Sequence, residues 1–425
     1  MLALIVLAMF TVLGLAHIRA ANSSLLKAAN LNRVHRARQQ AESGLEYFTY
    51  ILTRAEVPAD VTGEALVAAL ADASPAPLNT EISADDSDGG FTATLSADGS
   101  VVTLTVCGRQ GEVQRTVTMD FNLAPAGSSI FDYAVAGMGK IEMSDNSRIR
   151  GANSPSEANV LSATYRTNKA FKLSGNACID GDVYAPNPDA YAQLSDNASI
   201  GGENRQSEEI QDHIHIGIED VEFPEVDPSV FESFAVNLVE KKTKTEGDET
   251  FTNIRIKAGA DPDFSGNVII NGVVFIEKPN KVKFSDNATI TGIIVTQDAG
   301  DGAHNANKIE FSGNARIRGV GHLPDESAFT GLKKLPGSSL LAPGFGVAFK
   351  GDFGTIEGAM AAERFTFDKD VSGTVHGAVI SYGSEQISLS GNSVLTFDRS
   401  DSPDVPPGFS TPSTLVAVPS TYREH

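Results

Sequence analysis

The chain has 425 residues, enough for several compact units, and a formal net charge of −21. This acidic balance argues against nucleic acid as a partner. The charge is unevenly distributed: residues 1–18 carry no charged side chain, whereas six Lys and Arg residues face two Glu residues between positions 19 and 54. The two cysteines, Cys107 and Cys178, allow one disulfide at most and do not reveal the redox compartment.

The first predicted element is one long helix over residues 1–52. Residues 1–18 are nearly all apolar, and a helix of that length would reach roughly 27 Å, enough for a thin bilayer. A stripe with helical spacing then continues without a break through Leu31, Val34, Ala37, Ala41, Leu45, Phe48 and Leu52. We therefore expect residues 1–55 to form a membrane-anchoring helix, although the stripe could also pack on the chain's own globular part. A cleaved signal peptide is the competing interpretation, but no basic segment precedes the apolar run.

The second half of this helix ends in QQAESGLEYF, residues 39–48, where Ala41, Glu42, Gly44 and Leu45 match an Ala-Glu-x-(Gly/Ala)-Leu pattern. It resembles the N-terminal region of the PilX-type minor pilins and K-type pseudopilins of type IV pilus and type II secretion systems. The resemblance covers about 55 residues; a basic leader and the early acidic residue of major pilins are absent. It implies pilin or pseudopilin subunits and the inner membrane as partners, with a periplasmic or extracellular C-terminal domain. The small residues expected to face sister helices are Ala37, Ala41 and Gly44.

Residues 56–128 are predicted to form a short helix and a three-stranded antiparallel sheet. The helix covers residues 61–71, and alternating polar and apolar residues mark strands at 91–95, 101–107 and 113–121. Asp98-Gly99 and residues 109–111 separate the strands as hairpin turns. This order also fits the pilin resemblance, which implies a small sheet against the second half of the long helix.

A short phrase recurs between residues 129 and 399, and it predicts a β-solenoid domain. Each copy begins with an apolar residue, followed by Ser, then by Gly or Asp, and then by Asn. In six copies an Ile lies three residues after this Asn. The copies are MSDNSRIRG, LSGNACIDG, LSDNASIGG, FSGNVIING, FSDNATITG, FSGNARIRG and the partial LSGNSVLTF, starting at Met143, Leu173, Leu194, Phe264, Phe284, Phe311 and Leu389. Irregular spacing of about 20 to 30 residues is typical of solenoids, and period 2 around each Ile indicates strands.

Stacking these units would form a parallel β-helix in which the Ser-Gly/Asp-Asn step makes a turn and the Asn side chains bond from layer to layer. The Phe residues that open three copies would stack inside. The predicted asparagine ladder consists of Asn146, Asn176, Asn197, Asn267, Asn287, Asn314 and Asn392. The predicted fold is thus mostly β: a long N-terminal helix, a small antiparallel sheet and a parallel β-helix.

Two segments depart from the repeat pattern. Between residues 203 and 262 we expect a helical insertion, with Asp227 as the N-cap, Pro228 at the first helical position and an apolar stripe of Phe231, Phe234 and Leu238. The tail, residues 400–425, is rich in Pro and Ser and is expected to be disordered.

Few residues form patterns typical of catalysis or metal binding. Asp212, His213 and His215 could offer two imidazoles to a metal, and Asp85, Asp86 and Asp88 could bind Ca²⁺, but exposed strand and turn residues explain both groups. The variable positions of the repeats build no acidic column of the kind that a polysaccharide-cleaving β-helix needs. We therefore expect no enzyme activity, no metal and no cofactor.

The sequence favours a membrane-anchored minor pilin-like or pseudopilin-like surface component whose β-solenoid serves as an interaction or adhesion module. Its ligand would be a surface polysaccharide or a protein. Two alternatives remain open: a carbohydrate-active β-helix enzyme, and a structural polymer of the bactofilin type.

Overall fold

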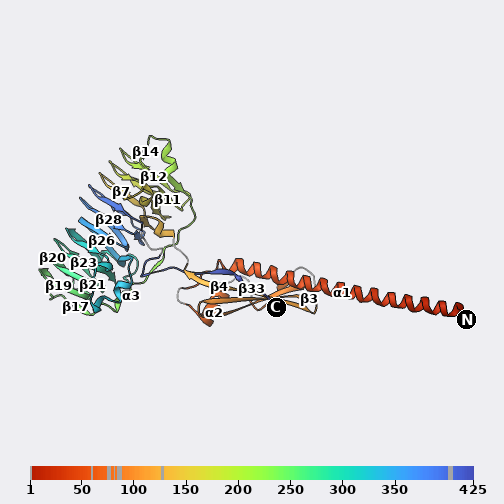
Figure 1. Ribbon diagram of the computed structural model, residues 1–425. Helices are drawn as coiled ribbons and strands as arrows, with labels where there is room; N and C mark the ends of the chain where they lie inside the picture. Colours follow the sequence, from red (N-terminus) through yellow and green to blue (C-terminus); the bar gives the residue numbers. More distant parts are fainter. Residues whose placement is uncertain are drawn as a thin grey trace. The chain divides into compact units, whose positions relative to one another are not determined.

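The computed structural model describes the backbone of residues 2–58, 61–73, 78–80, 82–83, 89–125, 129–400 and 405–425. The protein is mostly β, with one long N-terminal helix, a small antiparallel sheet and a large, mainly parallel sheet (Figure 1). It divides into two compact units. The first comprises Met1–Ala126 and Thr411–His425, and the second comprises Gly127–Ser410.

The first unit packs a helix against an antiparallel sheet. Helix α1 (Leu2–Leu52) is continuous, as predicted, and α2 (Gly63–Ala73) follows it. The three predicted strands are present, and two more extend the sheet to the order β1-β2-β3-β4-β33. Its strands are β1 (Ile82–Ser83), β2 (Gly89–Asp98), β3 (Val101–Gln110), β4 (Val113–Pro125) and β33 (Ser413–Glu424). The core between the layers includes Leu45, Phe48, Leu52, Leu66, Leu70, Val102, Leu104 and Phe121.

The expectation of a disordered tail is wrong from Ser413 onward. Strand β33 pairs antiparallel with β4, with Leu415 opposite Leu123 and Ala417 opposite Phe121. Leu415 is 1% exposed in the core of the first unit. The Pro and Ser residues that suggested disorder concentrate before this strand, whereas TLVAV has the composition of a strand. Residues 401–404 lie outside the described part of the chain.

The second unit contains a 26-stranded sheet. Its chain makes successive circuits, each consisting of a few short strands, and equivalent strands of adjacent circuits pair in parallel. One series runs, in stacking order, through β17, β19, β21, β23, β26, β27, β29, β5, β8, β11 and β15. Their bounds are Asn237–Val239, Thr250–Ile256, Ile269–Ile276, Thr289–Thr296, Ser338–Glu357, Ala359–Phe367, Val379–Ser381, Val135–Gly137, Val160–Ser162, Val183–Ala185 and Ile214–Ile216. The last circuit in sequence therefore pairs with the first, in the middle of the stack (Figure 1).

The same circuits contribute further strands on other sides of the stack. One set is β20 (Asp263–Gly266), β22 (Lys281–Phe284), β24 (Lys308–Gly313), β30 (Ile387–Leu389), β6 (Ile141–Met143), β9 (Lys169–Leu173) and β12 (Tyr191–Leu194). Strand β18 (Glu246–Gly247) pairs with β20 at the start of this set. Another set is β25 (Arg316–Arg318), β28 (Ser372–His376), β31 (Val394–Phe397), β7 (Arg148–Gly151), β10 (Cys178–Ile179) and β13 (Ser199–Ile200). Strand β14 (Glu203–Asn204) turns back antiparallel on β13.

The interior of the stack contains a row of aromatic rings. Phe284 stacks on Phe264 at 5.3 Å between ring centroids and on Phe311 at 5.2 Å, which confirms the predicted stacking of these residues. Phe349 and Phe367 continue the row at 4.8 and 5.3 Å. In register with Phe367 come Leu389, Met143 and Leu173 from the neighbouring circuits. The apolar lead position of the motif is thus the same interior position in successive circuits.

A second apolar core lies on the outside of the stack, where side chains of β21, β23, β26, β27 and β29 point away from the interior. Residues 218–235 and β32 (Phe409–Ser410), which pairs with β16 (Glu225–Val226), cover this surface. The expected helical insertion is wrong in extent, because α3 comprises only Ser229–Glu232. Its Phe231 is fully buried, but the chain re-enters the sheet at β17, which leaves Leu238 55% exposed.

Candidate functional site

The motif turn depends on the residue before the asparagine. Asp145, Gly175, Asp196, Gly266, Asp286, Gly313 and Gly391 have φ between 55° and 85°. Glycine reaches this left-handed region freely and aspartate more readily than most residues. The alternation of Gly and Asp at the third motif position therefore follows from the backbone, whereas the asparagine itself has an ordinary φ.

Aspartate at this position also has a partner in the adjacent circuit. Asp286 accepts a hydrogen bond from the backbone N–H of Gly266 at 3.0 Å, and Asp196 accepts one from Gly175 at 3.1 Å. Asp145 likewise accepts from Gly391 at 3.0 Å. A Cβ at Gly175 would lie 2.8 Å from the carbonyl oxygen of Asp145, so the backbones of these two turns approach each other closely. Ser-Asp-Asn and Ser-Gly-Asn copies thus complement each other across the stack.

The side-chain amides of the seven motif asparagines form two hydrogen-bonded runs. In the first, Asn197 donates to Asn176 (3.0 Å), Asn176 to Asn146 (2.8 Å), Asn146 to Asn392 (2.8 Å) and Asn392 to Asp370 (2.8 Å). In the second, Asn314 donates to Asn287 (3.4 Å), Asn287 to Asn267 (3.1 Å) and Asn267 to Asp248 (2.9 Å). Each run ends on an aspartate, which needs no further acceptor because an ionised carboxylate only accepts. All seven asparagines are exposed.

The helix motif Ala41, Glu42, Gly44 and Leu45 faces the sheet of its own unit. Ala41 is fully buried, and a Cβ at Gly44 would lie 2.6 Å from the ring of Phe91. A Cβ on Gly108 of β3 would lie 2.1 Å from the carbonyl oxygen of Ala37. The expectation that Ala37, Ala41 and Gly44 face sister helices is therefore wrong, because their small size allows α1 to approach β3.

Glu42 is also occupied within the chain. Its carboxylate lies 2.9 Å from Nε of Arg38 and accepts from the hydroxyl of Tyr422 at 3.5 Å. Arg38 in turn lies 3.4 Å from Glu424. These contacts join α1 to β33, so the motif positions the helix on its own sheet.

The side chains in the first half of α1 are exposed. All side chains from residue 9 to residue 33 are exposed. The large apolar ones are Met9, Phe10, Val12, Leu13, Leu15, Ile18, Leu25, Leu26 and Leu31, each 58–73% exposed. Among the described residues, no helix combines the length and hydropathy needed to cross a membrane, so the predicted span over residues 1–18 is not supported. The side chains of residues 1–8 lie outside the described set.

The two histidines that the sequence singled out converge on Asp182, not on Asp212. His213 Nδ1 lies 2.7 Å from one Asp182 oxygen, and His215 Nε2 lies 3.2 Å from the other. Burial favours a higher pKa for Asp182, but the hydrogen bonds to His213 and His215 outweigh it and lower that pKa. In the described part of the chain no three such side chains are arranged to hold a metal ion. Sequence reasoning missed Asp182 because the pairing of β11 with β15 brings it near the histidines. Residues 85–88, the proposed Ca²⁺ turn, lie outside the described residues.

The two cysteines are free thiols in different units. Burial raises the pKa of the Cys178 thiol. The disulfide that two cysteines allow is therefore not formed in this structure.

Comparison with known proteins yields little. No family model and no curated protein matches the sequence. Among solved structures, the crystal structure of the competence-associated pilin ComZ from Thermus thermophilus is similar at a TM-score of 0.29 and 11% identity. The alignment covers 92% of this chain and 97% of that one. A TM-score this low supports no argument about fold or function.

Proposed function

We propose that this protein is a pilin-like component of a surface assembly, joined to pilin or pseudopilin subunits and the inner membrane through the first half of α1. Its second unit is a β-solenoid with an asparagine ladder, displayed in the periplasm or outside the cell as an interaction module. It binds rather than catalyses and requires no cofactor. The observation that carries the proposal is a continuous 51-residue helix whose first half has exposed apolar side chains.

Exposed apolar side chains along half of a helix favour association with another molecule that would bury them. Burying one large aliphatic or aromatic side chain stabilises a complex by about 1.5–3 kcal/mol. Nine such side chains are exposed between residues 9 and 31. The second half of the same helix is already packed on the sheet through Ala37, Ala41 and Phe48. The helix is thus divided into a half that docks its own unit and a half available for assembly.

The solenoid role is supported by the parallel register of the circuits and by the amide-to-amide hydrogen bonds between motif asparagines. Each circuit is bonded to the next through backbone and side chains, which favours a stiff body with side chains in regular rows. Such a body presents a repeated surface to a ligand, as an adhesion or interaction module requires.

The test is a pair of substitutions in the exposed first half of α1. Leu25→Gln with Leu26→Gln should remove the protein from sheared pilus fractions without changing its melting temperature, because both residues are 67% exposed. The matched control is Tyr50→Gln, which changes a 60% exposed residue in the docked half and should leave incorporation intact. Normal incorporation of the double variant would contradict the proposal. Gly44→Leu is unsuitable, because it would disturb the packing on Phe91.

A further inference from the structure

The exposed half of helix α1 carries its apolar and its charged side chains at different levels along the axis. From residue 9 to Ile18 no side chain is charged, and the large apolar ones are 58–73% exposed. The first acidic residue of the helix is Glu42, about 36 Å beyond Ile18 at a rise of 1.5 Å per residue. Between these two residues lie exposed cations without an intervening carboxylate, namely Arg19, Lys27, Arg33 and Arg36. The helix thus changes from apolar to cationic directly after Ile18.

The apolar side chains surround the helix instead of lining one face. Met9 and Ile18 are about two and a half turns apart, so they point in opposite directions. Phe10 and Val12 are separated by about 160° for the same reason. A groove on a protein covers only part of such a helix, whereas the hydrocarbon chains of a lipid leaflet enclose it. Residues 9–18 extend over about 15 Å, the depth of the hydrocarbon in one leaflet.

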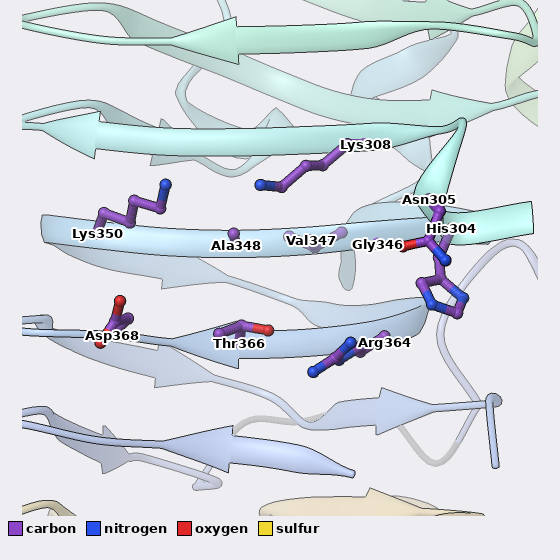
Figure 2. Close-up of a pocket in the computed structure, with 10 residues that line it drawn as sticks. All are labelled: His304, Asn305, Lys308, Gly346, Val347, Ala348, Lys350, Arg364, Thr366 and Asp368. Carbon is purple, nitrogen blue, oxygen red and sulfur yellow. The ribbon is translucent and has the colours of Figure 1, made fainter. Parts of the chain in front are cut away.

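A group of cations on the second unit shows how positive charge is balanced elsewhere in the chain. Figure 2 shows Lys308, Lys350 and Arg364 on the adjacent strands β24, β26 and β27. Lys308 and Lys350 lie 3.1 and 2.9 Å from one oxygen of Glu310. Burial favours a higher pKa for Glu310, but the hydrogen bonds from Lys350 and Lys308 outweigh it and lower that pKa. The carboxylates that balance the three cations are those of Glu310, Glu385 and Asp368.

In the described part of the chain, the cations that directly follow the apolar segment of α1 have no carboxylate partner. The ion pairs of this helix are those of Arg38, with Glu42 at 2.9 Å and with Glu424 at 3.4 Å. Arg19 and Lys27 therefore present unbalanced positive charge on an otherwise acidic chain. An anionic partner from outside the chain would be attracted to this level of the helix.

We propose that residues 9–18 enter one leaflet of a bilayer end-on and that Arg19 binds the phosphate of an anionic phospholipid at its surface. A guanidinium group can donate to two oxygens of one phosphate, and its long side chain reaches from the hydrocarbon boundary to the headgroups. A zwitterionic headgroup already has an ammonium group beside its phosphate, whereas an anionic headgroup leaves the phosphate charge unbalanced. The complementary charge therefore favours the anionic lipid.

Distance along the helix ranks the other cations. Lys27 lies about 12 Å beyond Arg19, and Arg36 lies about 26 Å beyond it. The screening length is about 8 Å at physiological ionic strength, so Lys27 should contribute less than Arg19 and Arg36 almost nothing. This inference rests on the membrane contact of the proposed function and adds the lipid class and the residue that sets the depth. It does not depend on assembly into a pilus.

Flotation of the full-length chain with lipid vesicles in about 0.15 M salt tests the inference. Vesicles that mix phosphatidylglycerol into phosphatidylcholine should bind the chain more tightly than pure phosphatidylcholine. Arg19→Gln should weaken binding to the mixed vesicles by about fivefold and change binding to pure phosphatidylcholine little. Lys27→Gln should cause a smaller loss. Arg19→Lys, which keeps the charge, should retain most of the affinity.

The matched control is Arg36→Gln, which removes the same charge from another exposed position of the same helix. It should leave the affinity unchanged, and circular dichroism melting should show that every variant keeps its fold. Equal losses in Arg19→Gln and Arg36→Gln would overturn the inference, and so would an unchanged affinity of Arg19→Gln. In the latter case, loss of this variant from sheared pilus fractions would identify a neighbouring subunit as the partner of Arg19.

The two kinds of vesicle also separate this inference from the proposed function. Equal binding to both would overturn the choice of an anionic lipid and leave the membrane contact of the proposed function standing. Binding to neither would contradict both.

Discussion

The two units keep their strands in place in opposite ways. In the second unit the same contact recurs from circuit to circuit, so the Phe264, Phe284 and Phe311 row repeats one interaction at one position. In the first unit each decisive contact occurs once: Ala37 against Gly108, and β33 against β4. A contact that recurs in every circuit requires the same residue type at a regular spacing, so it can be predicted from the sequence. A unique contact between distant segments leaves no such pattern.

The largest effect should come from breaking the repeated row. Phe311→Ala removes a ring stacked between Phe284 and Phe349 and should destabilise the second unit by about 3–5 kcal/mol. Chemical denaturation followed by tyrosine fluorescence and circular dichroism measures the loss. The matched control is Phe251→Ala, where the ring is only partly buried, and its loss should be clearly smaller. Equal losses would mean that stacking adds nothing beyond local burial.

The next largest effect should come from the unique contact in the first unit. Gly108→Ala places a methyl group against the backbone of Ala37 and Ala41, which should destabilise this unit by about 1–3 kcal/mol. Hydrogen exchange should show faster opening of β3 and β4, with unchanged protection in the second unit. Gly14→Ala is the control, because a Cβ there has no heavy atom within 4 Å. Equally faster exchange in both units would contradict their independence.

The asparagine row should contribute less than the aromatic row, because its amides are exposed. Asn287→Ala removes a donor to Asn267 and an acceptor for Asn314, and should cost about 0.5–1.5 kcal/mol. Asn314→Ala removes a single bond of 3.4 Å and should cost less. Thermal melts of the two variants side by side check this order. The reverse order would show that the row is not a cooperative ladder.

The smallest effect concerns the pH dependence of the second unit. The folded pKa of Glu310 lies below its ordinary value of 4.5, so its ionised form stabilises the fold above that pH, and the stabilisation is lost as the pH falls below 4.5 through the folded pKa. Glu310→Gln should flatten the fall in unfolding free energy below pH 4.5. Glu249→Gln, at an exposed pair with Lys244, should not. Identical acid profiles of Glu310→Gln and the unaltered protein would refute this.

Features with a local or repeated signal could be predicted from the sequence. The stripe from Leu31 to Leu52 indicated the length of α1, and the hairpin turns separated β2, β3 and β4. The lead Phe residues of the motif indicated the interior row, and its asparagines indicated residues that the structure joins by hydrogen bonds. These features follow from spacing within about 30 residues.

Features that depend on distant pairing were missed. The tail looked disordered because its Pro and Ser content outweighed a 12-residue strand whose partner is nearly 300 residues earlier. Asp182 was missed because only the stacking of β11 on β15 brings it to His213 and His215. The small residues of α1 were assigned to sister helices because the sequence does not say which surface a helix stripe meets.

The pairing of β29 with β5 makes the stack a circular permutation of an uninterrupted array. If the chain were cut within residues 217–236 and the ends of the repeat region were joined, the circuits would follow one another in order from β17 to β15. Deleting the first or last repeat in sequence therefore removes an interior layer and splits the body, whereas both spatial ends are formed by residues near the middle of the sequence. New circuits can be added at either spatial end of this body only by insertion there.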